Sequence, residues 1–229
     1  MKVIFLDIDG VIQQLWRQDR FEHLDEIEEI AKELDQKIPG YNFHEYVTAE
    51  NFPESFQGAY SRKCNLGAVL FDWSKDAVKY LSEVLEHHNA KLVISSDWRD
   101  FGEHTMRAFL AIYGLDKYLY GMIEGLSFRE PTEGQIRARQ YFSEIYGKFS
   151  FDERAADIRD YLDKHHEITS YVAIDDRNLS FPVEKHFVFF NDGKVLNENR
   201  VHLMDEILNI EDGPYPLKQE EKMSEALKI

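Results

Sequence analysis

The amino-acid sequence predicts an α/β fold: a doubly wound parallel sheet with helices on both faces and a mostly helical insert. Short apolar runs alternate along the chain with segments of helical periodicity. Within the runs, apolar and polar residues do not alternate, which is typical of strands buried on both faces of a parallel sheet. The chain has 229 residues and a hydrophobic content of 43%, enough for a sizeable core.

Four apolar runs are the predicted strands, and each ends in polar residues. The runs cover residues 3–6, 92–94, 171–174 and 187–190. In an open parallel sheet, ligands bind at the carboxyl ends of the strands. The polar residues that follow the first three runs are therefore expected to converge. They are Asp7, Asp9, Ser95, Asp175 and Asp176.

Helices are predicted where apolar residues recur at helical spacing. Three of them cover residues 73–88, 155–165 and 200–210, and an acidic amphipathic helix lies near residues 24–34. Ser74 is a suitable N-cap for the first of these helices.

The alternation of strands and helices predicts one core domain that carries an insert. Residues 1–12 and 73–210 form the core, residues 13–72 the insert, and residues 211–229 a C-terminal tail. Long insertions are often lids or binding elements, and extra structural cover for the sheet explains this one equally well.

Composition narrows the classes of function. The net charge of −16 disfavours broad, non-specific binding to nucleic acid or to an anionic membrane, although a small local basic site is compatible with it. The single cysteine, Cys64, cannot form an intramolecular disulfide and fits a reducing compartment. No apolar stretch approaches the roughly 18 residues of a membrane span, so we expect a cytoplasmic protein.

The converging carboxylates require a positive partner. Mg²⁺ is the natural one, because it prefers oxygen ligands and commonly binds through one or two carboxylates together with a substrate phosphate. An aspartate can attack phosphorus, and an acid two residues further on can protonate the leaving group and later activate water. A hydroxyl such as that of Ser95 can hold a phosphoryl oxygen, and one basic side chain is still needed.

Three motifs resemble those of the haloacid dehalogenase (HAD) superfamily of phosphotransferases, and they occur in the family order. Asp7-Ile8-Asp9-Gly10-Val11 resembles the first motif, Leu92-Val93-Ile94-Ser95 the second, and Val172-Ala173-Ile174-Asp175-Asp176 the fourth. Two further phrases, Ser95-Ser96-Asp97-Trp98-Arg99 and Arg154-Ala155-Ala156-Asp157-Ile158, are similar to a HAD branch associated with RNA-repair proteins. The insert lies where the superfamily places one type of cap on its Rossmann-like core.

The resemblance implies a role for each matching residue. Asp7 is the nucleophile and a Mg²⁺ ligand, and Asp9 is the acid/base that offers its backbone carbonyl to the metal. Asp175 and Asp176 complete the magnesium site. The phosphate-binding residues are Ser95, Ser96 and, as the basic residue of the third motif, Arg154, with Lys148 as the alternative.

The resulting hypothesis is a Mg²⁺-dependent phosphohydrolase that cleaves a phosphomonoester through an aspartyl-phosphate. A catalytically silent HAD-like binding module is the alternative. A phospho-accepting signalling domain is less favoured, because in such domains the phospho-accepting acid follows a middle strand. The substrate class stays open, and it includes a phosphorylated nucleic-acid end. Arg99 either pairs with a surface acid or meets an anionic group of the substrate.

Overall fold

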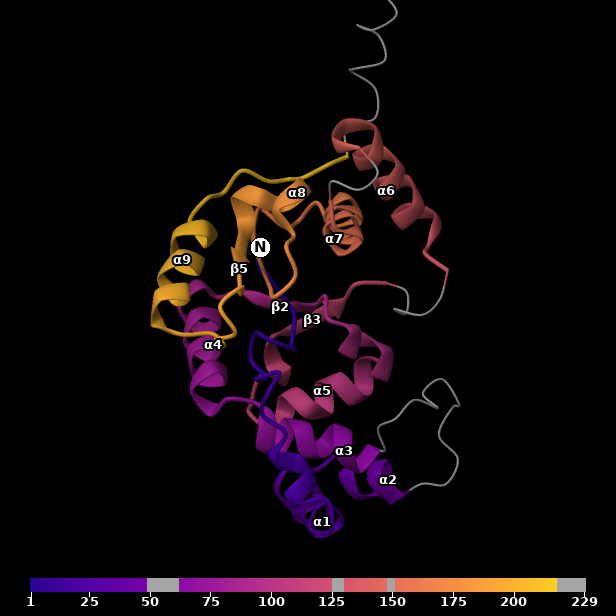
Figure 1. Ribbon diagram of the computed structural model, residues 1–229, viewed down its shortest axis with the longest axis vertical. Coiled ribbons are helices and arrows are strands. Elements are labelled where there is room, and N and C mark those ends of the chain that lie inside the picture. The colour runs from indigo at the N-terminus through magenta and orange to yellow at the C-terminus, as the bar shows by residue number, and fades with distance from the viewer. Residues whose placement is uncertain (49–61, 125–129, 148–150, 218–229) are drawn as a thin grey trace, which may run out of the picture.

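Within the residues that the computed structural model describes, 1–48, 62–124, 130–147 and 151–217, the chain forms a five-stranded sheet (Figure 1). The strand order is β3-β2-β1-β4-β5, and every neighbouring pair is parallel. The strands are β1 (Lys2–Leu6), β2 (Lys91–Ile94), β3 (Leu119–Met122), β4 (Ser170–Asp175) and β5 (Phe187–Phe189). The predicted α/β class is confirmed.

Four of these strands coincide with the predicted apolar runs, whereas no apolar run indicates β3. This strand lies at the edge of the sheet, where Tyr120 is exposed and Gly121 interrupts the sequence. The glycine is required by packing, because a Cβ at position 121 would lie 2.8 Å from the Tyr161 hydroxyl.

Helices cover both faces of the sheet, as predicted. The three predicted core helices are α4 (Lys75–His88), α7 (Glu153–Lys164) and α9 (Glu198–Leu208). Further helices outside the insert are α5 (Glu103–Ala111), α6 (Glu133–Tyr146) and the short α8 (Ser180–Val183). Ser74 caps α4, since its hydroxyl accepts a hydrogen bond from Ala77 N at 3.3 Å. Among the described residues, every helix is too short or too polar to cross a membrane.

Alternate residues of β1 face opposite sides of the sheet, and the two sides have different cores. Ile4 and Leu6 belong to a hydrophobic cluster that includes buried residues of α4, α5 and α9. Val3 and Phe5 belong to a second cluster with the buried face of α7. The central strand is therefore buried on both sides, which explains its uninterrupted apolar sequence.

The described part of the insert is helical and packs onto the first of these clusters. Its elements are the turns η1 (Asp19–Glu22) and η3 (Ala68–Asp72) and the helices α1 (Ile27–Lys37), α2 (Phe43–Thr48) and α3 (Arg62–Gly67). The helices gather in the lower part of Figure 1, below α5. Phe43, Leu66 and Val69 are buried in the same cluster as Ile4 of the sheet. The domain boundaries given above stay a prediction.

The first residues of the predicted tail pack against the core. Tyr215 is buried with Tyr171 and Ile168, and its hydroxyl donates a hydrogen bond to Asp212 Oδ1 at 2.7 Å. This contact fixes the chain after α9 beside β4. Residues 218–229 lie outside the described residues.

Candidate active site

The predicted site residues meet at the carboxyl end of the central strands. β1 ends at Leu6, and the next amide, Asp7 N, donates a hydrogen bond to Ile174 O at 3.0 Å. On the other side of β1, Ser95 N donates to Leu6 O at 3.0 Å. The ends of β1, β2 and β4 are thus joined through the backbone, which places Asp7, Ser95 and Asp175 at one edge of the sheet.

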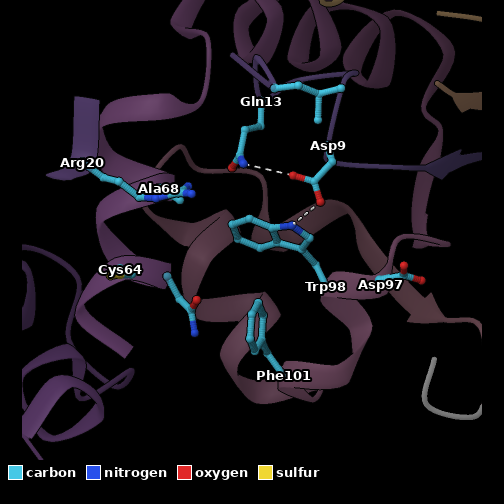
Figure 2. Close-up of a pocket in the computed structure, with 10 residues that line it drawn as sticks. Asp9, Gln13, Arg20, Cys64, Ala68, Asp97, Trp98 and Phe101 are labelled. Atoms are coloured by element: carbon cyan, nitrogen blue, oxygen red, sulfur yellow. Dashed lines mark hydrogen bonds between the residues drawn. The ribbon is translucent and has the colours of Figure 1, made fainter. Parts of the chain in front are cut away.

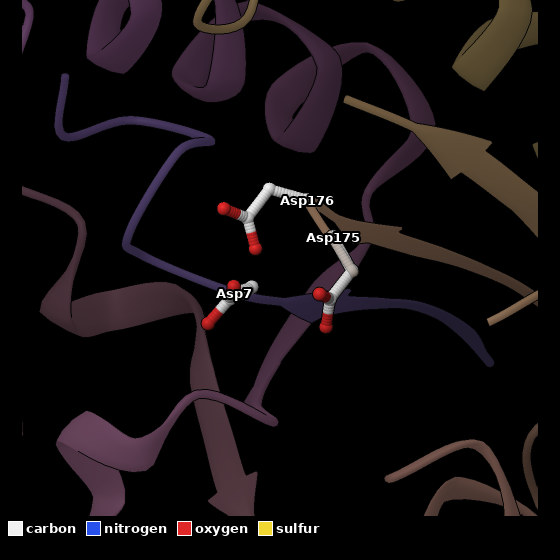
Figure 3. A group of neighbouring side chains, drawn as sticks. All are labelled: Asp7, Asp175 and Asp176. Atoms are coloured by element: carbon white, nitrogen blue, oxygen red, sulfur yellow. The ribbon is translucent and has the colours of Figure 1, made fainter. Parts of the chain in front are cut away.

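Three carboxylates form a cluster at this edge. One oxygen each of Asp7, Asp175 and Asp176 lies within 4.8 Å of the others, and Figure 3 shows the Asp176 carboxylate pointing toward Asp7. Burial raises the pKa of all three groups, that of Asp175 to about 7. Carboxylates that are buried this close together are stabilised by a cation, and this set of hard oxygen donors fits Mg²⁺.

Gly10 makes room for this cluster. Its φ of +73° lies in the left-handed region, which glycine tolerates best. A Cβ at position 10 would lie 2.5 Å from Asp176 Oδ2, so any side chain here would displace that carboxylate. The glycine of the first motif therefore sets the position of the last acid of the fourth.

Arg154 lies among these acids. It stands in the first turn of α7, and its Nη1 is 3.1 Å from Asp7 Oδ1 and 2.8 Å from Asp175 Oδ2. Its Nη2 is 3.1 Å from Asp97 Oδ1. The guanidinium thus offsets part of the negative charge at the strand ends. Lys148, the alternative for this role, lies outside the described residues.

The position of Arg154 depends on the cap of α7. Asp152 is the N-cap residue, and its Oδ1 accepts a hydrogen bond from Arg154 N at 2.8 Å. The other oxygen of Asp152 accepts from the guanidinium of Arg177 at 2.7 Å, and Arg177 N donates to Asp175 Oδ1 at 2.7 Å. Asp152 and Arg177 therefore connect the start of α7 to the loop after β4.

The two serines after β2 have different surroundings. The Ser95 hydroxyl is buried and has no hydrogen-bond partner among the described residues. A buried hydroxyl of this kind can donate a hydrogen bond to a ligand. The Ser96 hydroxyl accepts from Trp98 N at 3.4 Å and caps the turn η4 (Asp97–Phe101). A hydrogen bond from Ser96 to Asp7 also opposes the effect of burial on the pKa of that carboxyl.

Arg99 supports the backbone beside these serines. Its Nη1 donates to Ser95 O and to Ser96 O, at 3.0 Å each, and lies 3.4 Å from Asp97 Oδ1. The side chain is buried. Of the two roles considered above, pairing with an acid is present through Asp97, but the main contacts are to backbone carbonyls.

The Asp9 carboxylate lies apart from the metal cluster and is held on both oxygens (Figure 2). Gln13 Nε2 donates to Asp9 Oδ1 at 3.0 Å, and Trp98 Nε1 donates to Asp9 Oδ2 at 2.9 Å. Burial, followed by the charge of Asp7, raises the pKa of Asp9 to about 6. Such a carboxyl group can both give and take a proton near neutral pH.

Five residues of this site were not among the predicted ones: Gln13, Asp97, Trp98, Asp152 and Arg177. Asp97 and Trp98 belong to a phrase that resembles the RNA-repair branch, so the sequence marked them without assigning a role. Gln13 and Arg177 follow the first and fourth motifs closely, and closeness to a motif is the only signal that could have indicated them.

The fold and this arrangement of acids define a domain of the HAD superfamily. More narrowly, a family model described as the HAD domain in Swiss Army Knife RNA repair proteins matches residues 3–201. The chain belongs to this family, which confirms the resemblance of its motifs, and the matched region includes the insert. Neither a curated protein nor a solved structure matches the chain.

Proposed function

We propose that the protein is a Mg²⁺-dependent phosphohydrolase that cleaves a phosphomonoester through an aspartyl-phosphate on Asp7. One observation carries this proposal. The Asp7 carboxylate lies between two further carboxylates suited to a metal and an arginine, beside a buried serine hydroxyl without a partner among the described residues. The family's HAD domain supports the same class of reaction.

In the first step of the proposed reaction, a carboxylate oxygen of Asp7 attacks phosphorus and the ester P–O bond breaks. Asp9, protonated, gives its proton to the leaving alkoxide, which departs as an alcohol. In the second step, ionised Asp9 takes a proton from water, and the resulting hydroxide attacks the phosphorus of the aspartyl-phosphate. Inorganic phosphate leaves, Asp7 is regenerated, and Asp9 is protonated again.

The surrounding residues support these steps. The Ser95 hydroxyl donates to a phosphoryl oxygen, and the charge of Arg154 orients Asp7 and opposes the effect of burial on the pKa of its carboxyl. Mg²⁺ held by Asp7, Asp175 and Asp176 would neutralise charge on the phosphoryl group. The indole of Trp98 and the amide of Gln13 fix the direction in which Asp9 presents its proton.

A phosphorylated RNA end is one substrate that fits this proposal, because the matched family is described by RNA repair. With a net charge of −16, such an end would be held at the local site rather than along an extended basic surface. A catalytically silent module that only binds phosphate is the alternative.

The decisive experiment is phosphate release from p-nitrophenyl phosphate with Mg²⁺ and then with a chelator. We expect metal-dependent release by the wild type and a loss of about 1,000-fold or more in Asp7→Asn, because the nucleophile is gone. Asp160→Asn is the control, since Asp160 is also a buried aspartate but pairs with Lys164 on α7.

Wild-type rates in Asp7→Asn would rule out the phosphoenzyme. If no protein releases phosphate, binding of beryllofluoride with Mg²⁺, followed by ¹⁹F NMR, tells a binding module from an enzyme whose pocket rejects aryl phosphates. Tight binding without turnover of any phosphomonoester would favour the silent module.

A further inference from the structure

A pocket of about 330 Å³ opens beside Asp9, between the insert and the core (Figure 2). The insert lines it with Arg20 and Ala68, among others, and the core with Trp98 and Phe101. Its volume is near the lower end of the range for small-molecule sites. The pocket can therefore hold one compact organic group.

The pocket lies on one particular side of the reaction centre. Asp9 lines it, whereas Asp7, Asp175 and Asp176 do not. An acid that protonates the departing oxygen must contact the leaving group, and the nucleophile and the metal ligands contact the phosphoryl group instead. The pocket thus lies where the leaving group of the proposed reaction belongs.

One wall of the pocket is apolar and rigid. The rings of Trp98 and Phe101 pack edge to face, with centroids 5.5 Å apart at 88°. The indole nitrogen is turned toward Asp9, so carbon atoms of the ring are left to contact a ligand. A short carbon skeleton would pack on this wall.

Gln13 provides a polar group that lacks a partner. The residue is buried, with 7% of it exposed, and it lines the pocket. Nε2 faces Asp9 and donates to its Oδ1, as suits the ionised carboxylate, which only accepts hydrogen bonds. The other end of the amide, Oε1, is then a buried acceptor with no hydrogen-bond partner among the described residues.

The backbone holds this amide in place. Gln13 N donates to Ile8 O at 3.0 Å, and Gly10 N donates to Gln13 O at 2.8 Å. Gln13 also forms bridges with Asp9 and with Trp73. With the backbone fixed and Nε2 bonded to Asp9, a donor on the ligand would satisfy Oε1.

We propose that this pocket binds the leaving group and that Gln13 selects an alcohol with a hydroxyl next to the scissile ester, as in a polyol phosphate. The proposal rests on the proposed function, because Asp9 marks the leaving-group side only if it is the acid. Oε1 lies one amide group away from the atom that binds Asp9. We expect a hydroxyl on the carbon adjacent to the ester carbon to donate to Oε1 while the ester oxygen contacts Asp9.

The test uses two phosphates that differ in one hydroxyl: 2-hydroxypropyl phosphate and n-propyl phosphate. For the wild type with Mg²⁺, we expect kcat/KM to be at least about 10-fold higher for the hydroxylated compound, because the analogue leaves the amide oxygen unpaired. Gln13→Met, which keeps the length and loses the acceptor, should bring the ratio close to one.

Trp98→Phe is the matched variant. It removes the other donor to Asp9 and keeps the Gln13 acceptor, so it should slow both substrates and leave their ratio unchanged. If Trp98→Phe also brought the ratio of the two kcat/KM values close to one, the preference would depend on the orientation of Asp9. That result would overturn the role of Gln13.

Equilibrium binding of the same two phosphates to Asp7→Asn with Mg²⁺ separates this proposal from the proposed function. A preference of about 10-fold for the hydroxylated compound, lost when Gln13→Met is added, supports the pocket even if no variant turns over. Metal-dependent hydrolysis of aryl phosphate together with equal binding of the two compounds would overturn the selection and leave the phosphatase mechanism intact.

Discussion

The raised pKa of Asp175 makes the stability of the folded protein depend on pH. Burial, and then the charge of Asp7, raises its pKa to about 7, although Arg154 opposes both effects. Between the ordinary aspartate value of 3.8 and about 7, the native protein holds a proton that the unfolded chain has released. Its contribution to stability is therefore full below the unfolded value and is lost as the pH rises toward 7.

Asp175→Asn should show this pH dependence directly. In chelator, we expect the difference in unfolding free energy between variant and wild type to shift in favour of the variant by about 1–3 kcal/mol from pH 5 to pH 8. Urea unfolding at a series of pH values measures it. With Mg²⁺ at pH 8 the order should reverse, because only the wild type keeps all three carboxylates. A difference that stays constant with pH in chelator would contradict the raised pKa.

In the turn after β1, the candidate site depends directly on packing. Gly10 and Gly193 have similar left-handed φ values, +73° and +70°, but differ in surroundings. A Cβ at position 10 would collide with Asp176, whereas nothing lies within 4 Å of a Cβ at position 193. Substitution of Gly193 therefore tests the left-handed backbone alone, whereas substitution of Gly10 tests the backbone together with the collision with Asp176.

Gly10→Ala and Gly193→Ala should therefore differ in their effect on Mg²⁺. Each is expected to lose about 1 kcal/mol of unfolding free energy from the left-handed backbone. Only Gly10→Ala should also weaken Mg²⁺ binding, by about 10-fold or more, since it moves Asp176 out of the cluster. Calorimetric titration with Mg²⁺ checks this, and equal affinities in the two variants would exclude Asp176 as a ligand.

At the same scale, the strands that carry the motifs were predictable and β3 was not. β1, β2 and β4 lie inside the sheet, and each contains an unbroken apolar run, which is a strong signal in the sequence. β3 pairs on one side only and contains an exposed tyrosine and a glycine, so burial does not select an apolar run. β3 forms because it pairs with β2, and the local sequence of a segment does not reveal its pairing partner.

The candidate site divides in a similar way. The acids could be predicted because each follows a strand in a known motif order. The support for Asp9 could not, because Trp98 is 89 positions away in the sequence and meets Asp9 only once β1 and β2 are paired. Hydrogen bonds of this kind follow from the tertiary fold and leave no periodic pattern.

Across the whole molecule, a buried ion pair closes the insert. Arg20 Nη1 lies 2.7 Å from Asp72 Oδ2, and Arg20 N donates to Asp72 Oδ1 at 3.1 Å. The pair connects η1 to η3, the two turns that flank the insert helices. Both side chains are buried, so neither charge can turn to water when the other is removed.

Asp72→Ala should accordingly destabilise the protein by about 3–5 kcal/mol, because a buried guanidinium loses its counter-charge. Asp19→Ala is the control in the same insert: Asp19 pairs with Arg17 in an exposed position, and its loss should cost no more than about 1 kcal/mol. Denaturant unfolding compares them. Similar losses in the two variants would mean that the buried pair does not hold the insert in place.

The strand order also has a consequence for how the protein is made. β1 is the first strand along the chain and the central one in the sheet, with β2 on one side and β4 on the other. During synthesis its first neighbour follows only from Lys91 on, and its second only from Ser170 on. Until both neighbours have been made, the strand that ends at Asp7 has at least one open edge. The ribosome must therefore release the chain up to Asp176 before Asp7 can meet its acidic partners.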